Sequence, residues 1–348
     1  MLDDANILKQ RDPDGALEVV SQQYKQEKYE VEIRNPNHDN REIRNIVFAG
    51  MGGSALAALL VKNWLKTELG LPFEIFRSYD LPEYVVHNTL VILSSYSGNA
   101  EETLSSLDQA MARGAQIAVL TSGGSLLEKA DKNQITCALL PKGLQPRMAV
   151  IDDLRALVKI LVNFNVISNE RLDDISSTSD WIKGESSKWL ANIPTEQNYA
   201  KQLAQKIVGK TAVFYSGTLT APVAYKWKIS INENAKNMAF WNELPEANHN
   251  EFIGWTSHPV EKPFAVFDIV SSFENPKILR RFEITDRLLS GKRPKATEIN
   301  LVGDSAIKQL LWGSILADFV GIYLAILNNV NPMPVELIEK LKKEIAQS

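Results

Sequence analysis

Short apolar runs alternate with longer amphipathic segments along most of the chain, as in proteins that mix strands and helices. In the first half, the runs 46–49, 90–93 and 117–120 are apolar throughout, and 73–76 is a weaker run. Strands that are covered on both faces have this character. Because such strands alternate with helical segments, the pattern predicts a doubly wound α/β fold with parallel strands.

Helices are expected between these strands, and residue signals mark their ends. One helix should follow Ser54 and stop at Gly70, since Pro72 comes two residues after that glycine. Asn99 and Glu102 have the spacing of a cap with a carboxylate three residues on. Ser125 and Glu128 repeat that spacing. These pairs predict the starts of the next two helices.

The second half of the chain repeats this layout. Strands are predicted at 212–215, 264–270 and 298–302. A Ser-Gly-Thr turn follows the first of them and leads into a helix from about Pro222. The stretch 238–249 reads as irregular, and helices are expected at 307–327 and 334–346. The polar stretch 168–180 is the expected break between two copies of one domain.

We therefore predict a helical N-terminal extension at 1–40 and two domains at 41–165 and 180–348. Each domain should be a three-layer αβα structure, with a parallel sheet sandwiched between helices. A chain of 348 residues is long for a single core, which agrees with two domains.

Composition narrows the class of protein. The net charge is −4, from 42 acidic and 38 basic side chains, so no strong positive field would gather nucleic acid or an anionic membrane. Cys137 is the one cysteine, which excludes an internal disulfide. The polar start is not expected to be a signal peptide, and no uninterrupted apolar run approaches the roughly 20 residues of a membrane span. We expect a soluble cytoplasmic protein.

Two turns rich in glycine and serine follow two of the predicted strands. The first contains Gly52, Gly53 and Ser54, and the second contains Ser95 and Ser97. Such turns present free backbone N–H groups and hydroxyls at the start of a helix, where the helix dipole favours an anion. The pair predicts a site for an anionic small molecule, most simply a phosphate.

A dinucleotide site is the alternative for the first turn, because Gly50, Gly52 and Ala55 fit the G-x-G-x-x-A fingerprint. That fingerprint requires an acidic residue at the end of the second strand, whereas Glu74 lies inside the strand and Arg77 follows it. A pair of tight strand–helix turns without a ligand is the third possibility.

Metal sites are poorly supported by the sequence, and we expect no metal or other cofactor. The four histidines, His38, His87, His249 and His258, are scattered without a close ligand pair. Ser54 also lacks the Gly-x-Ser-x-Gly surroundings of a hydrolase nucleophile.

Five motifs, taken together, resemble the bifunctional phosphoglucose/phosphomannose isomerases of the sugar-isomerase (SIS) domain superfamily. They are Gly50-Met51-Gly52-Gly53-Ser54-Ala55, Ser95-Tyr96-Ser97-Gly98-Asn99, Gln145-Pro146-Arg147, Asn232-Glu233-Asn234 and Asn248-His249-Asn250. They occur in the family's order over about 46–342, and the 16-residue spacing from Glu233 to His249 (249 − 233) also fits.

The resemblance implies two SIS domains, a homodimer, and metal-independent interconversion of glucose 6-phosphate or mannose 6-phosphate with fructose 6-phosphate through a cis-enediol. By the same resemblance, the glycines and serines of the two turns bind the phosphate and the nearby sugar. The family loop usually reads Ser-Gly-Asn-Thr, whereas this chain has Ala100 at the last position. One hydroxyl that would contact phosphate is therefore missing.

The resemblance also assigns the catalytic roles. Glu233 would be the base, Arg147 would stabilise the enediolate, and His249 would open the sugar ring from the other subunit. Lys342 matches the family's terminal lysine. The residues alone favour Glu233 as a surface residue paired with a nearby lysine, Lys226 or Lys236, and the motif reverses this preference. On the residues alone, Arg147 could be a surface arginine paired with Asp152 or Asp153.

Two other functions share the phosphate turns. One is a different SIS enzyme, such as a sugar-phosphate deaminase or the isomerase half of a glucosamine-phosphate synthase. The other is a sensor that binds sugar phosphate without turning it over. Such sensors usually carry a DNA-binding helix-turn-helix, which the first 40 residues do not suggest.

Overall fold

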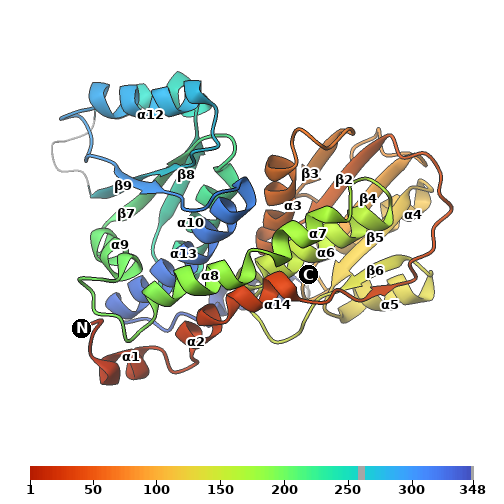
Figure 1. The fold of residues 1–348 in the computed structure, drawn as a ribbon. Helices are drawn as coiled ribbons and strands as arrows, with labels where there is room; N and C mark the ends of the chain where they lie inside the picture. Colours follow the sequence, from red (N-terminus) through yellow and green to blue (C-terminus); the bar gives the residue numbers. More distant parts are fainter. Residues whose placement is uncertain (258–262, 346–348) are drawn as a thin grey trace. The chain divides into compact units, whose positions relative to one another are not determined.

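The computed structural model describes residues 1–257 and 263–345 and contains two compact units. The first unit comprises residues 23–183 and 302–311, and the second comprises 1–22, 184–301 and the chain from Trp312 on. Each unit is built around one sheet (Figure 1). His258 and Ala346, which the sequence analysis mentions, lie outside the described residues.

The sheet of the first unit has six strands in the order β1-β6-β5-β4-β2-β3. Its strands are β1 (Ile33–Arg34), β2 (Asn45–Gly50), β3 (Phe73–Phe76), β4 (Thr89–Ser94), β5 (Gln116–Thr121) and β6 (Thr136–Leu139). Five of them run parallel, and only the two-residue β1 pairs antiparallel, with β6. The predicted doubly wound parallel sheet is confirmed.

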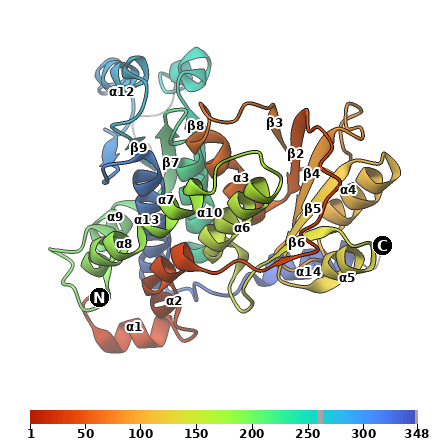
Figure 2. The same cartoon turned by 45° about the vertical axis from the view of Figure 1, so that its right-hand side comes forward.

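Helices cover both faces of this sheet. They are α3 (Gly52–Trp64), α4 (Glu101–Ala112), α5 (Gly124–Lys132), α6 (Val150–Asn163) and α7 (Glu170–Ser176), with two 3-10 turns, η1 (Gln23–Lys28) and η2 (Pro146–Met148). α3 and α6 lie on one face, and α4 and α5 lie on the other (Figures 1 and 2). Alternating strand residues such as Val91 and Leu93 pack with Leu107 of α4 and Leu126 of α5, which forms one side of the core.

The sheet has a topological switch point at β2, where successive strands are added on opposite sides. From β2 the chain passes to β3 on one side, and the next strand, β4, pairs with the other side of β2 in register Gly50↔Ser94. The turns after β2 and β4 therefore lie next to each other at the carboxyl ends of the strands. In open α/β sheets, ligands bind at this position.

The sheet of the second unit has four parallel strands in the order β10-β9-β7-β8. They are β7 (Thr211–Ser216), β8 (Ala239–Glu243), β9 (Phe264–Val270) and β10 (Thr297–Asn300). This order matches β5-β4-β2-β3 of the first sheet strand for strand, so the repeated layout that the sequence indicated exists in the structure.

The second unit contains most of the remaining helices. They are α1 (Ala5–Arg11), α2 (Ala16–Ser21), η3 (Ser187–Trp189), α9 (Tyr199–Ile207), α10 (Ala221–Ala235), η4 (Glu246–His249), α11 (Glu251–Gly254), α12 (Pro276–Leu288) and α14 (Glu336–Ile345). Phe214 of β7 packs on Trp227 of α10 on one face of the sheet. Tyr215, the next residue, joins a second core with Phe282 of α12 on the other face.

Two helices belong to both units, α8 (Ser179–Ser186) and α13 (Ala306–Leu327). By length and composition, α13 is the one helix in the described part of the chain that could cross a membrane, but 94% of its apolar window is buried inside the protein. Its Asp318 is fully buried and accepts a hydrogen bond of 2.5 Å from Lys226 of α10. A buried, paired charge of this kind is typical of a core helix.

Several local predictions were wrong. The strands β1, β6 and β8 were not foreseen, and β8 occupies part of the stretch that was expected to be irregular, 238–249. The N-terminal 40 residues are helical only in part, since β1 follows η1. α4 begins at Glu101 after Ala100 and has no side-chain cap, and α5 begins at Gly124 without one. The two proposed capping pairs are therefore not formed.

Candidate functional site

The turn after β2 forms the first turn of α3. Gly52 has a left-handed backbone (φ +54°), which places it where a residue with a side chain would be strained. Ser54 is buried, and its N–H donates to the carbonyl of Met51 at 3.1 Å. Met51, the residue before the helix, offers no side-chain cap. The helix therefore begins with backbone N–H groups that can donate hydrogen bonds to an anion.

The turn after β4 adds hydroxyl groups beside the first turn. Ser95 is buried, and its Oγ accepts a weak hydrogen bond of 3.4 Å from the N–H of Ala100, which precedes α4. Ser97 is exposed, and its Oγ accepts from the N–H of Asn99 at 3.4 Å. Both hydroxyl groups thus lie at the start of α4, a second helix N-terminus with no side-chain cap.

A third turn, after β5, fixes the shape of the second. Gly98 has φ +73°, and a Cβ there would collide with the carbonyl oxygen of Gly123. The side chain of Asn99 accepts from the N–H of Ser125 at 3.0 Å, at the start of α5. The prediction that Asn99 caps α4 was wrong. Its side chain instead connects the turn of Ser95 and Ser97 to the start of α5.

Arg147 lies against the first turn. It is only 1% exposed, so the alternative of a surface arginine is wrong. A Cβ added to Gly53 would stand 3.0 Å from the carbonyl oxygen of Pro146 and 3.2 Å from the nitrogen of Arg147. The first unit thus brings together Gly52, Gly53, Ser54, Ser95, Ser97 and Arg147, all named from the sequence.

Three buried acids of the first unit were not anticipated: Asp152 and Asp153, which follow Arg147 in the chain, and Glu27. Asp152 and Asp153 open α6, and both carboxylate oxygens of Asp153 lack a hydrogen-bond partner. Burial raises the pKa of Asp152 to about 7 and the pKa of Asp153 well above its ordinary value. Burial likewise raises the pKa of Glu27 in η1 to about 8, against the opposing effect of its hydrogen bond from Thr178. Nothing in the local sequence separates these acids from surface carboxylates.

Glu233 is half-buried in the last turn of α10. The two lysines that could neutralise it have other partners within the second unit. Lys226 bonds Asp318, and Lys236 donates to the carbonyl oxygen of Asn331 at 2.6 Å. Lys226 and Lys236 therefore each have a partner other than Glu233.

His249 ends the 3-10 turn η4 and is exposed. Lys342 is exposed on α14, whose side chains in the described part are all solvent-accessible. In the second unit, the three remaining candidates thus occupy three different elements, α10, η4 and α14. Glu233 and His249 flank β8 in the chain.

The second sheet has its own turn in the position that corresponds to the turn after β2, the predicted phosphate turn. It follows β7, and a carboxylate of the protein fills it. Glu274, which is buried, comes from the turn after β9, and its Oε2 accepts from the N–H of Leu219 at 2.9 Å. A Cβ on Gly217 would collide with the same carboxylate. The sequence does not reveal this occupant.

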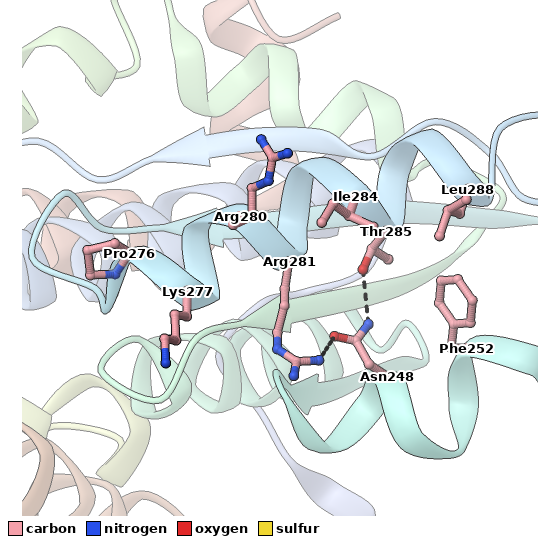
Figure 3. Close-up of a pocket in the computed structure, with 9 residues that line it drawn as sticks. All are labelled: Asn248, Phe252, Pro276, Lys277, Arg280, Arg281, Ile284, Thr285 and Leu288. Atoms are coloured by element: carbon pink, nitrogen blue, oxygen red, sulfur yellow. Dashed lines mark hydrogen bonds between the residues drawn. The ribbon is translucent and has the colours of Figure 1, made fainter.

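A hollow of about 570 Å³ opens between η4, α11 and α12 (Figure 3). Its lining combines apolar side chains with three basic ones: Asn248, Phe252, Pro276, Lys277, Arg280, Arg281, Ile284, Thr285 and Leu288. Asn248, next to His249, lies at its edge with its amide directed toward α12.

The duplicated sheet, with hydroxyls and free amides at the switch point of its first copy, defines a phosphosugar-binding protein of the SIS class. The SIS domain model matches residues 41–150, and the bacterial phospho-glucose isomerase C-terminal SIS domain model matches residues 196–345. A bifunctional phosphoglucose/phosphomannose isomerase of Caldicellulosiruptor bescii is 36% identical over 88% of this chain and 91% of its own. The chain belongs to the family of bifunctional phosphoglucose/phosphomannose isomerases.

This membership confirms the expected class of enzyme, an isomerase of sugar phosphates, and sets aside a nicotinamide enzyme and a non-catalytic sensor. A D-glucosamine-6-phosphate 4-epimerase of Sulfolobus acidocaldarius is also similar, with 37% identity over 59% of this chain and 62% of its own. Among solved structures, a putative phosphosugar isomerase of Salmonella typhimurium shares the fold, with a TM-score of 0.67, 17% identity, and coverage of 93% of this chain and 96% of its own.

Proposed function

We propose that the enzyme interconverts glucose 6-phosphate, mannose 6-phosphate or both with fructose 6-phosphate, without a metal, through a cis-enediol. The observation that carries this proposal is the pair of uncapped, hydroxyl-bearing turns at the switch point of the first sheet. Family membership over most of the chain supports the choice of substrates. The protein would act in the cytoplasm.

The phosphate would be held by Gly52, Gly53, Ser54, Ser95 and Ser97. The amides at the start of α3 and the hydroxyl groups at the start of α4 both favour a doubly negative group. No cation is required for this, because two helix N-termini and several hydrogen-bond donors serve one anion.

Isomerisation moves a proton between C1 and C2 of the open-chain sugar, and Glu233 would carry it. A half-buried carboxylate can accept a proton from one carbon and return it to the other. The enediolate that forms carries negative charge, and the buried guanidinium of Arg147 would stabilise it. Burial matters because a charge acts more strongly where water is excluded.

Ring opening requires a proton to move from the C1 hydroxyl to the ring oxygen, and His249 would perform it, since imidazole titrates near neutral pH. We propose that the enzyme is a homodimer in which each His249 serves the site of the other subunit, in agreement with its exposure. Lys342, on the exposed α14, would add a further positive charge near the sugar.

The test is an assay with fructose 6-phosphate in the presence of EDTA, in which glucose 6-phosphate and mannose 6-phosphate are separated and quantified. We expect both products, and Glu233→Gln should lower kcat by at least roughly a thousandfold, as the loss of a general base does. Glu298→Gln, an exposed glutamate of β10, is the control. Absence of both products from folded protein, or near-normal turnover by Glu233→Gln, would overturn the assignment.

The similarity to the glucosamine-6-phosphate epimerase makes a second candidate worth measuring. That reaction would change the configuration at C4 and would leave C1 and C2 untouched. The same assay with glucosamine 6-phosphate separates the two. Turnover of glucosamine 6-phosphate without turnover of fructose 6-phosphate would favour the epimerase.

A further inference from the structure

The side chain of His249 makes no hydrogen bond among the described residues, yet its neighbours in the chain are held by side chains from two directions. We propose that Asn248 and Glu251 are positioning residues, which fix the short segment that carries His249. The inference rests on the proposed role of His249 in ring opening and adds residues to which no role in the reaction has been given.

Helix α12 holds the segment from one side. Arg281 Nη1 donates to Asn248 Oδ1 at 3.2 Å, and Asn248 Nδ2 donates to Thr285 Oγ1 at 2.9 Å (Figure 3). Arg281 and Thr285 are four residues apart and therefore share one face of α12. The amide of Asn248 uses both its acceptor and its donor, so one orientation of the side chain is favoured.

Strands β7 and β8 hold the segment from the other side. Glu251 Oε1 accepts from the hydroxyl of Tyr215 at 2.7 Å, and its Oε2 accepts from Asn242 Nδ2 at 2.6 Å. Tyr215 and Asn242 are direct neighbours on paired strands. One carboxylate therefore bridges two strands through short, charge-assisted hydrogen bonds, which are stronger than neutral ones.

The tyrosine that binds Glu251 is itself fixed. Tyr215 is buried, its hydroxyl accepts from Trp255 Nε1 at 2.9 Å, and the guanidinium of Arg293 lies 5.7 Å from the centre of its ring. Arg293 is buried as well. The anchor for Glu251 is thus part of the core of the second unit and does not belong to a surface loop.

Between these two anchors, the backbone itself is braced. Asn250 caps α11 by accepting from the N–H of Glu251 at 2.6 Å, and its Nδ2 donates to Glu246 at 2.7 Å. Residues 248, 250 and 251 all have side-chain bonds, and only the side chain of His249 is left to extend outward. A catalytic group that must reach its substrate with little error benefits from such support, because errors of about 1 Å cost roughly a hundredfold in rate.

The decisive variant is a double substitution that exchanges the carboxylate of Glu251 with the amide of Asn242. In Glu251→Gln, the amide has one acceptor oxygen and cannot accept from both Tyr215 and Asn242, so one of the two bonds is lost. In Glu251→Gln with Asn242→Asp, donor and acceptor change places, so the bond and the net charge are restored. Glu27→Gln, which replaces a buried carboxyl group in the first unit with an amide, is the control. Thermal unfolding of each variant shows whether it is folded.

Ring opening is measured directly as the exchange between the α and β anomers of glucose 6-phosphate, observed by NMR in a Glu233→Gln background that blocks isomerisation. We expect Glu251→Gln to slow enzyme-catalysed exchange by about tenfold or more and the double exchange to restore most of it. Isomerisation of a four-carbon aldose 4-phosphate, which cannot close a ring because its terminal oxygen is esterified, should change by less than about twofold in Glu251→Gln with Glu233 intact.

Two results would overturn the inference: unchanged anomer exchange in folded Glu251→Gln, or an equal loss on the ring-free substrate. His249→Ala separates this inference from the proposed function. If His249→Ala leaves anomer exchange intact, the ring-opening role of His249 fails and the inference fails with it. If His249→Ala abolishes exchange but Glu251→Gln does not affect it, only the positioning role is lost.

Discussion

Gly53 and Pro146 approach so closely that a Cβ on the glycine would stand 3.0 Å from the carbonyl oxygen of the proline. The contact involves backbone on the proline side and cannot relax by a simple side-chain rotation. The first turn of α3 and the turn that carries Arg147 can therefore pack this closely only because residue 53 has no Cβ.

Gly53→Ala should therefore displace the Pro146–Arg147 turn by a few tenths of an ångström without unfolding the protein. We expect kcat/KM for fructose 6-phosphate to fall roughly 10- to 100-fold, since misplacing a positioned charge is costly. Steady-state kinetics measure this. Gly70→Ala, where a Cβ meets nothing within 4 Å, should leave kcat/KM unchanged. Wild-type kinetics for Gly53→Ala would mean that the turn tolerates the methyl group.

Subunit mixing tests whether the active site is shared. Dimers of Glu233→Gln and dimers of His249→Ala should each be inactive on cyclic substrate. After random exchange, half of the dimers are hybrids, and each hybrid has one intact site if His249 acts across the interface. Activity should then recover to about a quarter of the wild-type value. Confirmed exchange without recovery would place His249 in the site of its own subunit.

Ala100 occupies the N-cap position of α4, with φ −67° and ψ 120° and no side-chain hydrogen bond. This backbone is suitable for a capping threonine, so Ala100→Thr should stabilise the protein by roughly 0.5–1 kcal/mol. The added hydroxyl should also lower KM for the phosphosugar. Ala100→Val has the same shape without the hydroxyl and isolates its effect. A KM equal to that of Ala100→Val would show that the hydroxyl does not contact the phosphate.

Glu27 makes stability depend on pH. Its pKa rises from 4.5 to about 8 in the folded protein because it is buried, so the folded state binds more protons than the unfolded state between these values. The free energy of unfolding should therefore fall as pH rises from about 4.5 to about 8.

Glu27→Gln removes this dependence and keeps an oxygen that can accept from Thr178. Relative to the wild type, we expect the variant to gain on the order of 1–3 kcal/mol at pH 8.5 and much less at pH 5. Urea denaturation at both pH values measures the difference. The exposed Glu30→Gln serves as the control. A gain that is the same at both pH values would contradict a raised pKa.

The two turns that we propose to bind phosphate could be predicted because their sequence signals are local. An apolar strand, then glycine and serine, then a helix is a pattern within about ten residues, and β2 and β4 carry it plainly. β8 was missed because Asn242 and Glu243 resemble loop residues, although Phe240 and Trp241 before them have strong strand preference.

Features that depend on residues far away in the sequence could not be predicted. Asn99 has the local spacing of a cap, but the turn after β5 offers it Ser125 instead. The burial of Arg147 depends on its contact with α3, and the support of Glu251 comes from two strands that pair only in the folded sheet. Tertiary context overrides local preference in each case.

The carboxylate of Glu274 occupies, in the second sheet, the turn that corresponds to the phosphate turn of the first. Duplication of a sheet would by itself provide two crevices for external anions, but here one of them is satisfied from within the chain. We therefore expect each polypeptide to bind one equivalent of phosphosugar. In the proposed mechanism, the second unit is thereby free of the task of holding the phosphate, and it supplies Glu233 and His249 to the reaction.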